Sequence, residues 1–271
     1  MNRTKRILIY VFLLIFITFS SHFIYNFVTL YFESQRLKDR LNGLSEVMHN
    51  LNAIIISSES IDTTAFLQGK ESFPSLVQKN VKGHPLYSWR FTEFLTLPVP
   101  LPHKLPWTAD EYGWVRETAP LPFCYGGNTK TVVFAVGGPD TAFDQINPTP
   151  AKSLPQNLIL FADVYESNTH WMQPGDFSIE NIPEKVNVPG GFGSSLYRGF
   201  NVVFVDGQIW HLQDDVPLNL LIRFCTITDA KKTSRDLLEP YCDFKQQLNR
   251  KEFLWLDWDT WALPNNELEN E

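Results

Sequence analysis

The stretch Phe200–Leu212, FNVVFVDGQIWHL, gives the clearest structural signal in this chain of 271 residues. Two runs rich in Val, Phe, Ile and Trp flank Asp206-Gly207. This pair suits a tight two-residue turn, in which both central residues need φ > 0. The sequence therefore predicts a β-hairpin with Asp206 and Gly207 as its structural turn.

Two further runs with the character of strands lie upstream of the hairpin. Thr131–Val136 (TVVFAV) ends at Gly137-Gly138-Pro139, and Asn157–Tyr165 (NLILFADVY) follows an irregular loop. Both runs are rich in the β-branched, aromatic and other apolar residues that strands favour. The centre of the chain is therefore expected to form a sheet.

The segments on either side of these strands have other patterns. Residues 57–130 are expected to form loops and short strands, because alternating prolines such as Pro98, Pro100 and Pro102 favour an extended backbone. Residues 233–250, which include SRDLLEPYCDFKQQLNR, are predicted to be helical with a kink at Pro240.

An apolar run near the N-terminus predicts a membrane anchor. Ile7–Phe32 is 26 residues long without an acidic or basic side chain. As a helix it would be about 39 Å long, enough for the roughly 30 Å hydrocarbon core of a bilayer. Arg3, Lys5 and Arg6 precede the run, so the positive-inside rule places residue 1 in the cytoplasm and the C-terminal body outside. The alternative is a signal peptide cleaved near Ser20-Ser21.

Residues 33–56 are expected to continue as an amphipathic helix. Its apolar stripe recurs at steps of three and four residues, at Leu37, Leu41, Leu44, Met48 and Leu51. The opposite, solvent-facing side is expected to carry Glu33, Arg36, Lys38, Asp39 and Arg40.

Net charge and cysteine content restrict the function. The net charge of −7 argues against a nucleic-acid partner, because such partners are held by clustered Lys and Arg. The three cysteines fit no zinc pattern. Cys225 and Cys242 are the candidate disulfide in an exported domain, and free buried thiols are the alternative.

No catalytic constellation is visible among the residues that carry chemistry. The six histidines are scattered, and His170-Trp171 with Asp176 could line a pocket. Two carboxylate pairs, Asp163 with Glu166 and Asp214 with Asp215, are expected on solvated edges, since general acid–base chemistry needs carboxyls at a set separation in a cleft. The sequence predicts neither catalytic nor cofactor-binding residues.

For three other patterns we prefer a structural interpretation to a binding site. A calcium site at Asp206, Asp214 and Asp215 is a minor hypothesis, and no metal site is predicted. The run Gly190–Gly193 resembles a phosphate-binding loop but lacks the lysine, and is expected to be a flexible loop. Three tryptophans near the C-terminus share one face at helical spacing, which favours docking onto the body over ligand binding. They are Trp255, Trp258 and Trp261.

Several segments together resemble the domain of unknown function 1559 family, a mostly planctomycete group of prepilin-type proteins with an H-x9-DG motif. Seven segments match in the family's order, over residues 36–213. They are Arg36–Asn50, Phe73-Pro74 with Gly83–Arg90 (GHPLYSWR), Leu105–Trp107, Pro122–Cys124, Val136–Phe143 (VGGPDTAF), Asn157–Asp176 and Phe200–Leu212. The resemblance implies an α+β, pilin-like fold, in which a long N-terminal helix packs on an antiparallel sheet with long loops. It also implies that the segment with His170-Trp171 and Asp176 forms a structural turn instead of lining a pocket.

The chain departs from the family pattern at its start and at the motif histidine. Prepilins have a cleavage glycine before the apolar helix and a glutamate near its beginning, and Ile7–Phe32 contains no acid. Leu196 stands where the motif histidine would precede Asp206-Gly207. The apolar run is therefore interpreted as a permanent tether rather than a device for filament assembly.

These observations combine into one expected organisation. Residues 1–6 form a cytoplasmic basic stub, 7–32 a single transmembrane helix, 33–56 the amphipathic helix, 57–213 a β-rich domain and 214–271 a C-terminal extension. The expected function is a non-enzymatic, pseudopilin-like structural or assembly role in the cell envelope, without cofactors. The expected partners are membrane lipid around residues 7–32 and envelope or secretion-system proteins. The alternative is an extracytoplasmic module that binds a glycan or peptide.

Overall fold

A computed structural model describes residues 24–26, 28–45, 72–73, 75–94, 104–120 and 123–247. The expected basic stub, most of the apolar run, residues 46–56 and the three C-terminal tryptophans lie outside the described residues.

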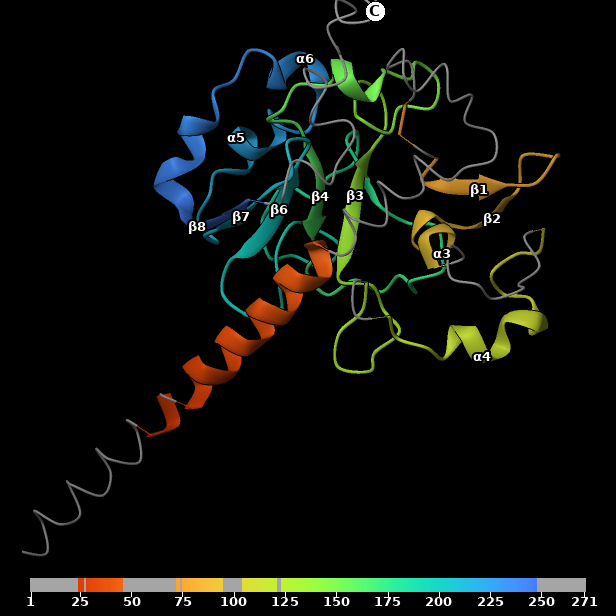
Figure 1. The fold of residues 1–271 in the computed structure, drawn as a ribbon, viewed down its shortest axis with the longest axis horizontal. Helices are drawn as coiled ribbons and strands as arrows, with labels where there is room; N and C mark the ends of the chain where they lie inside the picture. Colours follow the sequence, from red (N-terminus) through yellow and green to blue (C-terminus); the bar gives the residue numbers. More distant parts are fainter. Residues whose placement is uncertain are drawn as a thin grey trace, which may run out of the picture.

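The described body is built on one sheet of six strands in the order β5-β3-β4-β6-β7-β8 (Figure 1). The strands are β3 (Val133–Gly137), β4 (Ile159–Asp163), β5 (Phe177–Ser178), β6 (Phe200–Phe204), β7 (Gln208–Leu212) and β8 (Cys242–Gln247). All neighbours are antiparallel except β3 and β5, which are parallel. The strands predicted at 131–136 and 157–165 correspond to β3 and β4.

Short elements surround this sheet, and the fold class is α+β as the sequence predicts. β1 (Val77–Lys79) and β2 (Pro85–Ser88) form a separate two-stranded sheet. The helical segments of the body are α3 (Trp89–Phe94), η1 (Asp110–Tyr112), α4 (Gly113–Arg116), η2 (Ala151–Ser153), α5 (Leu218–Ile222), α6 (Ile227–Ala230) and η3 (Arg235–Tyr241).

Both faces of the central strands are buried. Every residue of β3, β4 and β6 is buried. Because side chains alternate between the faces of a strand, Phe161 and Val203 enter one core with β2 and α3, whereas Ala162 and Val202 enter another with α5 and η3. This double burial explains why these strands read as continuous apolar runs.

The predicted hairpin is present, but its turn lies one residue earlier than expected. β6 and β7 pair with Val203 opposite Ile209, and the Gly207 N–H donates to the Phe204 carbonyl at 3.0 Å. The central residues are therefore Val205 and Asp206, and only Gly207, at φ +76°, is left-handed. This is a three-residue loop, a type I turn closed by a left-handed glycine.

The helix predicted for residues 233–250 is wrong beyond Pro240. The segment forms the 3₁₀ helix η3 and then strand β8, which pairs with β7 through Trp210 opposite Lys245. Burial along β8 alternates with a period of two, with Phe244 partly buried and Lys245 exposed. Strand pairing thus overrides the local helical preference, and the main sheet extends past residue 213.

The N-terminal helix meets the body only at its end. Residues 28–45 are helical, and Figure 1 shows this segment projecting away from the sheet. Leu44 is fully buried, whereas Leu30 is 64% exposed. Among the described residues, no helix is both long and apolar enough to cross a membrane.

One residue of this helix lies on a different side from the one expected. Arg40 is buried, although the sequence analysis assigned it to the solvent-facing side. With a helix rotation of about 100° per residue, Arg40 lies within the stripe that contains Leu37 and Leu44.

Candidate functional site

A buried group of polar side chains lies where the N-terminal helix meets the sheet. We call Arg40, Asp163, Tyr197, Asn201 and His211 the Asp163 network. Asp163, at the end of β4, accepts from Arg40 Nη2 at 3.1 Å on Oδ1. Its Oδ2 accepts from the Tyr197 hydroxyl at 2.5 Å and from the Asn201 backbone and side-chain amides at 2.9 and 2.8 Å.

These contacts compensate the Asp163 charge. The Asp163 and Arg40 side chains are only 3% and 1% exposed, and a buried carboxylate is tolerated only with a counter-ion and hydrogen-bond donors. Burial first, and then the Asp163 carboxylate, hold the pKa of Tyr197 well above its usual range, so that its hydroxyl keeps the proton it donates. Asp163 therefore acts as the attachment point for the helix.

A second buried network surrounds Arg90, at the start of α3. Its Nη1 donates to Asp176 Oδ1 at 2.7 Å, and its Nε donates to the Trp171 carbonyl at 3.0 Å. Trp89 Nε1 and the Ala135 N–H donate to the same Asp176 oxygen, each at 2.9 Å. We call these residues the Arg90 network. It joins α3, β3 and the 171–176 loop, so the structure places Trp171 and Asp176 in the core.

His170 has a structural position beside this network. Its Nδ1 accepts the Met172 N–H at 3.2 Å, so its Nε2 carries the proton and donates to the Arg116 carbonyl at 3.0 Å. The ring stacks on Trp107 with centroids 5.1 Å apart. Burial lowers the pKa of His170. The ring is therefore a neutral packing element with both nitrogens occupied.

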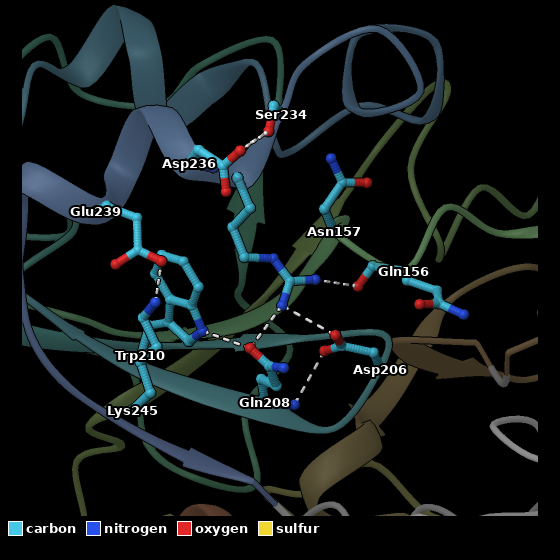
Figure 2. A pocket seen from close by; sticks show the side chains of 10 residues that line it. Gln156, Asn157, Asp206, Gln208, Trp210, Ser234, Asp236, Glu239 and Lys245 are labelled. Atoms are coloured by element: carbon cyan, nitrogen blue, oxygen red, sulfur yellow. Dashed lines mark hydrogen bonds and ion pairs between the residues drawn. The ribbon is translucent and has the colours of Figure 1, made fainter.

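A polar depression of about 590 Å³ lies between the β6–β7 turn and η3 (Figure 2). It is lined by Gln156, Asn157, Asp206, Gln208, Trp210, Ser234, Arg235, Asp236, Glu239 and Lys245. Figure 2 shows Ser234 and Asp236 on one side of the depression, across from Asp206 and Gln208 on the other.

Two ion pairs, Arg235 with Asp206 and Lys245 with Glu239, join charged groups that line the polar depression. Arg235 Nη1 donates to Asp206 Oδ2 and Gln208 Oε1, each at 2.9 Å. Lys245 is paired with Glu239, and its ammonium lies 4.0 Å from the centroid of the Trp210 ring. Trp210 itself is only 3% exposed. A ligand would have to displace these internal pairs, and it could not stack on the tryptophan.

The carboxylate pairs singled out in the sequence do not converge on a site. Asp163 is buried in an ion pair, so its expected place on a solvated edge is wrong, whereas Glu166 is exposed in a turn. Asp206 and Asp214 flank opposite ends of β7. This strand has five residues, so its two ends lie roughly 15 Å apart. In the described part of the chain, no three His, Cys, Asp or Glu side chains are placed to hold a metal ion.

The glycine run at residues 190–193 is a packed loop. The N–H groups of Gly190, Gly191 and Gly193 donate to the carbonyls of Tyr165, Val188 and Asp163, in that order. Phe192 is fully buried within the run. Because these N–H groups already donate to carbonyl oxygens, they are not available to bind a phosphate. The loop instead holds Phe192 in the core.

The three thiols are free in the structure. Cys124 and Cys225 are buried, and Cys242, the other half of the candidate disulfide, is partly buried. Burial raises the pKa of Cys124 to about 12 and raises that of Cys225 further. The buried thiols are therefore protonated and weakly nucleophilic.

The arginines that organise these sites are not among the functional residues predicted from the sequence. Arg40 could have been found from its place on an apolar stripe, because a cation there requires a buried acceptor. Arg90 and Arg235 carry no comparable local signal.

Comparison with known proteins adds no relative to these observations. No protein-family model matches the chain, and no curated protein or solved structure is significantly similar to it.

Proposed function

We propose that this chain is a membrane-tethered, pilin-like protein whose body lies outside the cytoplasm, with a structural or assembly role in the cell envelope. The observation that carries the proposal is the start of the N-terminal helix. Large apolar side chains there are exposed around the helix rather than folded onto the body; they are Ile24, Tyr25, Val28, Leu30, Tyr31 and Phe32. Exposed apolar side chains over most of the circumference of a helix suit lipid better than water.

The other end of the same helix supports a rigid tether. Arg40 is held by the buried Asp163, and Arg36 Nη1 reaches the Leu196 carbonyl at 3.3 Å. Phe32 and Arg40 are eight residues apart, or about 12 Å along a helix. The body would therefore stand close to the bilayer surface in a fixed orientation.

The packing of the segments that resemble domain of unknown function 1559 also supports a pilin-like assignment. The SWR segment, Ser88 to Arg90, contacts the segment from Trp171 to Asp176 through the Arg90 network. Trp107, from the third segment, stacks on His170. Segments distant in sequence thus serve one core, as expected if they are retained for the fold.

A non-enzymatic role fits the chemistry of the described residues. The buried titratable side chains of the Asp163 and Arg90 networks are occupied by structural partners, and the polar depression is closed by its own ion pairs. We therefore expect the protein to act through contacts with lipid and with envelope or secretion-system proteins.

Membrane extraction tests the tether. We expect the full chain to stay in the membrane fraction after alkaline extraction, and its body to be cleaved by protease added outside the cell. Leu30→Asp should release the chain, because a carboxylate in the bilayer costs roughly 2.5–3.5 kcal/mol. Val81→Asp, at a fully exposed apolar site between β1 and β2, is the control and should leave the chain in the membrane.

Two results would contradict the proposal. One is full extraction of the wild-type chain together with the Val81→Asp control. The other is a body protected from external protease. For the assembly role, crosslinking in intact cells should recover envelope partners, and a chain that remains monomeric and uncrosslinked would count against it.

The second proposal, an extracytoplasmic module that binds a glycan or peptide, is favoured by the polar depression. Its rim of amide, hydroxyl and charged groups suits hydrogen bonding to a hydroxyl-rich ligand. Glycan-array binding that is lost in Arg235→Met, and kept in the exposed control Arg223→Met, would support this alternative. Absence of binding by the wild-type protein would remove it.

A further inference from the structure

The His211 ring lies between two oxygen atoms inside the Asp163 network. Its Nδ1 is 3.0 Å from Asn201 Oδ1, and its Nε2 is 3.0 Å from the Arg198 carbonyl oxygen. Gly199 permits the second approach: its φ is +71°, and a Cβ added there would lie 2.6 Å from His211 Nε2. Both ring nitrogens therefore face hydrogen-bond acceptors.

The orientation of the Asn201 amide is fixed by its other contacts. Its Nδ2 donates to Asp163 Oδ2 at 2.8 Å and approaches the Tyr197 hydroxyl oxygen at 2.7 Å. Rotating the amide would turn its oxygen toward the Asp163 carboxylate, which is already paired with Arg40. Asn201 thus presents an oxygen, which has no proton to give, to His211.

We propose that His211 carries a proton on both ring nitrogens in the folded protein, and that this imidazolium holds the N-terminal helix on the sheet through Asn201 and Asp163. A neutral ring has one N–H and one lone pair. In this site the lone pair of a neutral ring would face an oxygen atom 3.0 Å away, which also carries lone pairs and has no proton to donate. The charged ring donates at both positions.

The surroundings of His211 contain charges of both signs. Burial of the ring is the largest influence, and it opposes the charge and leaves the pKa of His211 lowered. Asp163 on β4, the Arg198 carbonyl, Asp243 on β8 and Asp214 after β7 all raise the pKa. Tyr197 stays neutral, because its own pKa is held high. The geometry acts against burial, since only the imidazolium satisfies both acceptor contacts.

The remaining neighbours are a cation and an aromatic ring. The Arg40 guanidinium opposes the His211 charge, but it is bound to Asp163 Oδ1 and its charge is compensated there. The Phe244 ring stacks on His211 with centroids 4.9 Å apart and planes 8° apart. An aromatic face stabilises a cation placed over it, so Phe244 favours the charged ring.

The connection from His211 to the helix is short. His211 contacts the oxygen of the Asn201 amide, the nitrogen of the same amide donates to Asp163, and Asp163 binds Arg40. If helix attachment raises the His211 pKa, attachment is strongest below about pH 6.5, the ordinary value, and is lost as pH rises through the raised pKa. The inference does not depend on whether residues 7–32 lie in a membrane.

The protonation state can be measured directly on the full chain in detergent, labelled with ¹⁵N. Long-range ¹H–¹⁵N correlation distinguishes a ring protonated on both nitrogens from either neutral tautomer. His211→Gln assigns the signal, and His84→Gln, at an exposed hairpin residue, is the control. We expect both nitrogens to be protonated at pH 7, with a pKa at least one unit above 6.5. One unprotonated nitrogen at pH 6.5 would overturn the proposal.

Hydrogen exchange tests the coupling to the helix. After correction for the chemical exchange rate, amides of residues 36–45 should exchange at least tenfold faster above the His211 pKa than below it, relative to amides of β4. A tenfold change in the exchange rate corresponds to a difference of one unit between the His211 pKa with the helix attached and with it detached. His211→Gln should be fast at both pH values, and His84→Gln should behave as the wild type. Helix amides in the wild type that do not respond to His211 titration would refute the coupling, whether or not the variant folds.

Discussion

Replacing Arg90 with methionine tests how far a single buried cation supports the body. Arg90 donates to Asp176 at 2.7 Å, to the Trp171 and Gln173 carbonyls at 3.0 Å and to the Gly175 carbonyl at 2.9 Å. Its side chain is fully buried. Methionine fills much of the volume but donates nothing, so three carbonyls lose a donor and the Asp176 charge loses its counter-ion.

The expected cost follows from these contacts. Breaking a buried ion pair by removing one partner typically costs about 3–5 kcal/mol, because the other charge stays buried. A domain has about 5–15 kcal/mol of stability in total, so Arg90→Met should remove a large part of it. For a body of this size the midpoint of thermal unfolding should fall by roughly 6–20 °C.

Denaturant unfolding of the full chain in mild detergent, followed by tryptophan fluorescence, measures this loss. Trp89 and Trp171 belong to the Arg90 network and should report its disruption. Adding Asp176→Asn to Arg90→Met removes the uncompensated charge, so the double variant should be more stable than the sum of the single variants predicts, by about 1–3 kcal/mol. Arg223→Met, at an exposed position, is the control and should change stability by about 0.5 kcal/mol or less.

A loss of less than about 1 kcal/mol in a folded Arg90→Met variant would refute the reasoning, because removal of a buried counter-ion is expected to cost several-fold more. Strict additivity in the double variant would refute the assignment of the cost to the Asp176 charge.

Three further predictions concern other parts of the body. Gly207→Val should cost about 1–3 kcal/mol in denaturant unfolding, because φ is +76° there, and Gly207→Asn should cost less; equal costs would contradict the turn geometry. Burial lowers the pKa of His170, so as pH falls the imidazole is protonated in the unfolded chain before it is protonated in the folded protein. The contribution of His170 to stability should therefore decline below about pH 6.5. Unfolding curves from pH 5 to 8 that do not differ between wild type and His170→Gln would exclude this pH dependence. In the folded protein a thiol reagent should modify the partly buried Cys242 before the buried Cys225, and mass spectrometry that finds the two joined would contradict the free thiols.

The sheet could be predicted from sequence because its signals are local. The pattern that predicts the conformation is contained within a few residues in each case. This holds for the apolar runs that form β3 and β4 and for the turn at Gly207. The exact turn could not be predicted, because Asp206 next to Gly207 is compatible with either a two-residue or a three-residue loop. The register of β6 against β7 chooses between them.

The C-terminal strand illustrates a signal that local reasoning misjudges. LLEP followed by YCDFKQQL contains good helix formers, and the sequence favoured a helix kinked at Pro240. The period-two burial of β8 is also present in the sequence, with Phe244 between Asp243 and Lys245. It decides the outcome only because the edge of β7 is there to pair with, which no local pattern reveals.

The buried networks could not be predicted because their members are far apart in the chain. Arg40 and Asp163 are separated by 123 residues, and Arg90 and Asp176 by 86. From its local pattern Arg40 was expected on the solvent-facing side of the helix, and Asp163 was expected to form a carboxylate pair with Glu166. A helix that places a cation on its apolar stripe requires an anion in the body, but the anion's identity depends on the tertiary fold.

Three arginine–aspartate pairs in the described residues share one arrangement. Each arginine belongs to a segment that packs around the main sheet, and each aspartate lies in or beside one of its strands. Arg40 joins the N-terminal helix to β4, Arg90 joins α3 to the chain before β5, and Arg235 joins η3 to the β6–β7 turn.

The chemistry of the two side chains accounts for this division. Aspartate is short and stays fixed by the backbone that carries it, whereas the long guanidinium can also satisfy carbonyls several residues away. Arg90 reaches three such carbonyls and Arg235 reaches that of Gln156. A buried pair adds little net stability compared with apolar packing, but it penalises any arrangement that leaves one charge unpaired. These pairs therefore select where the outer segments attach, and for the N-terminal helix they select the direction in which it leaves the body.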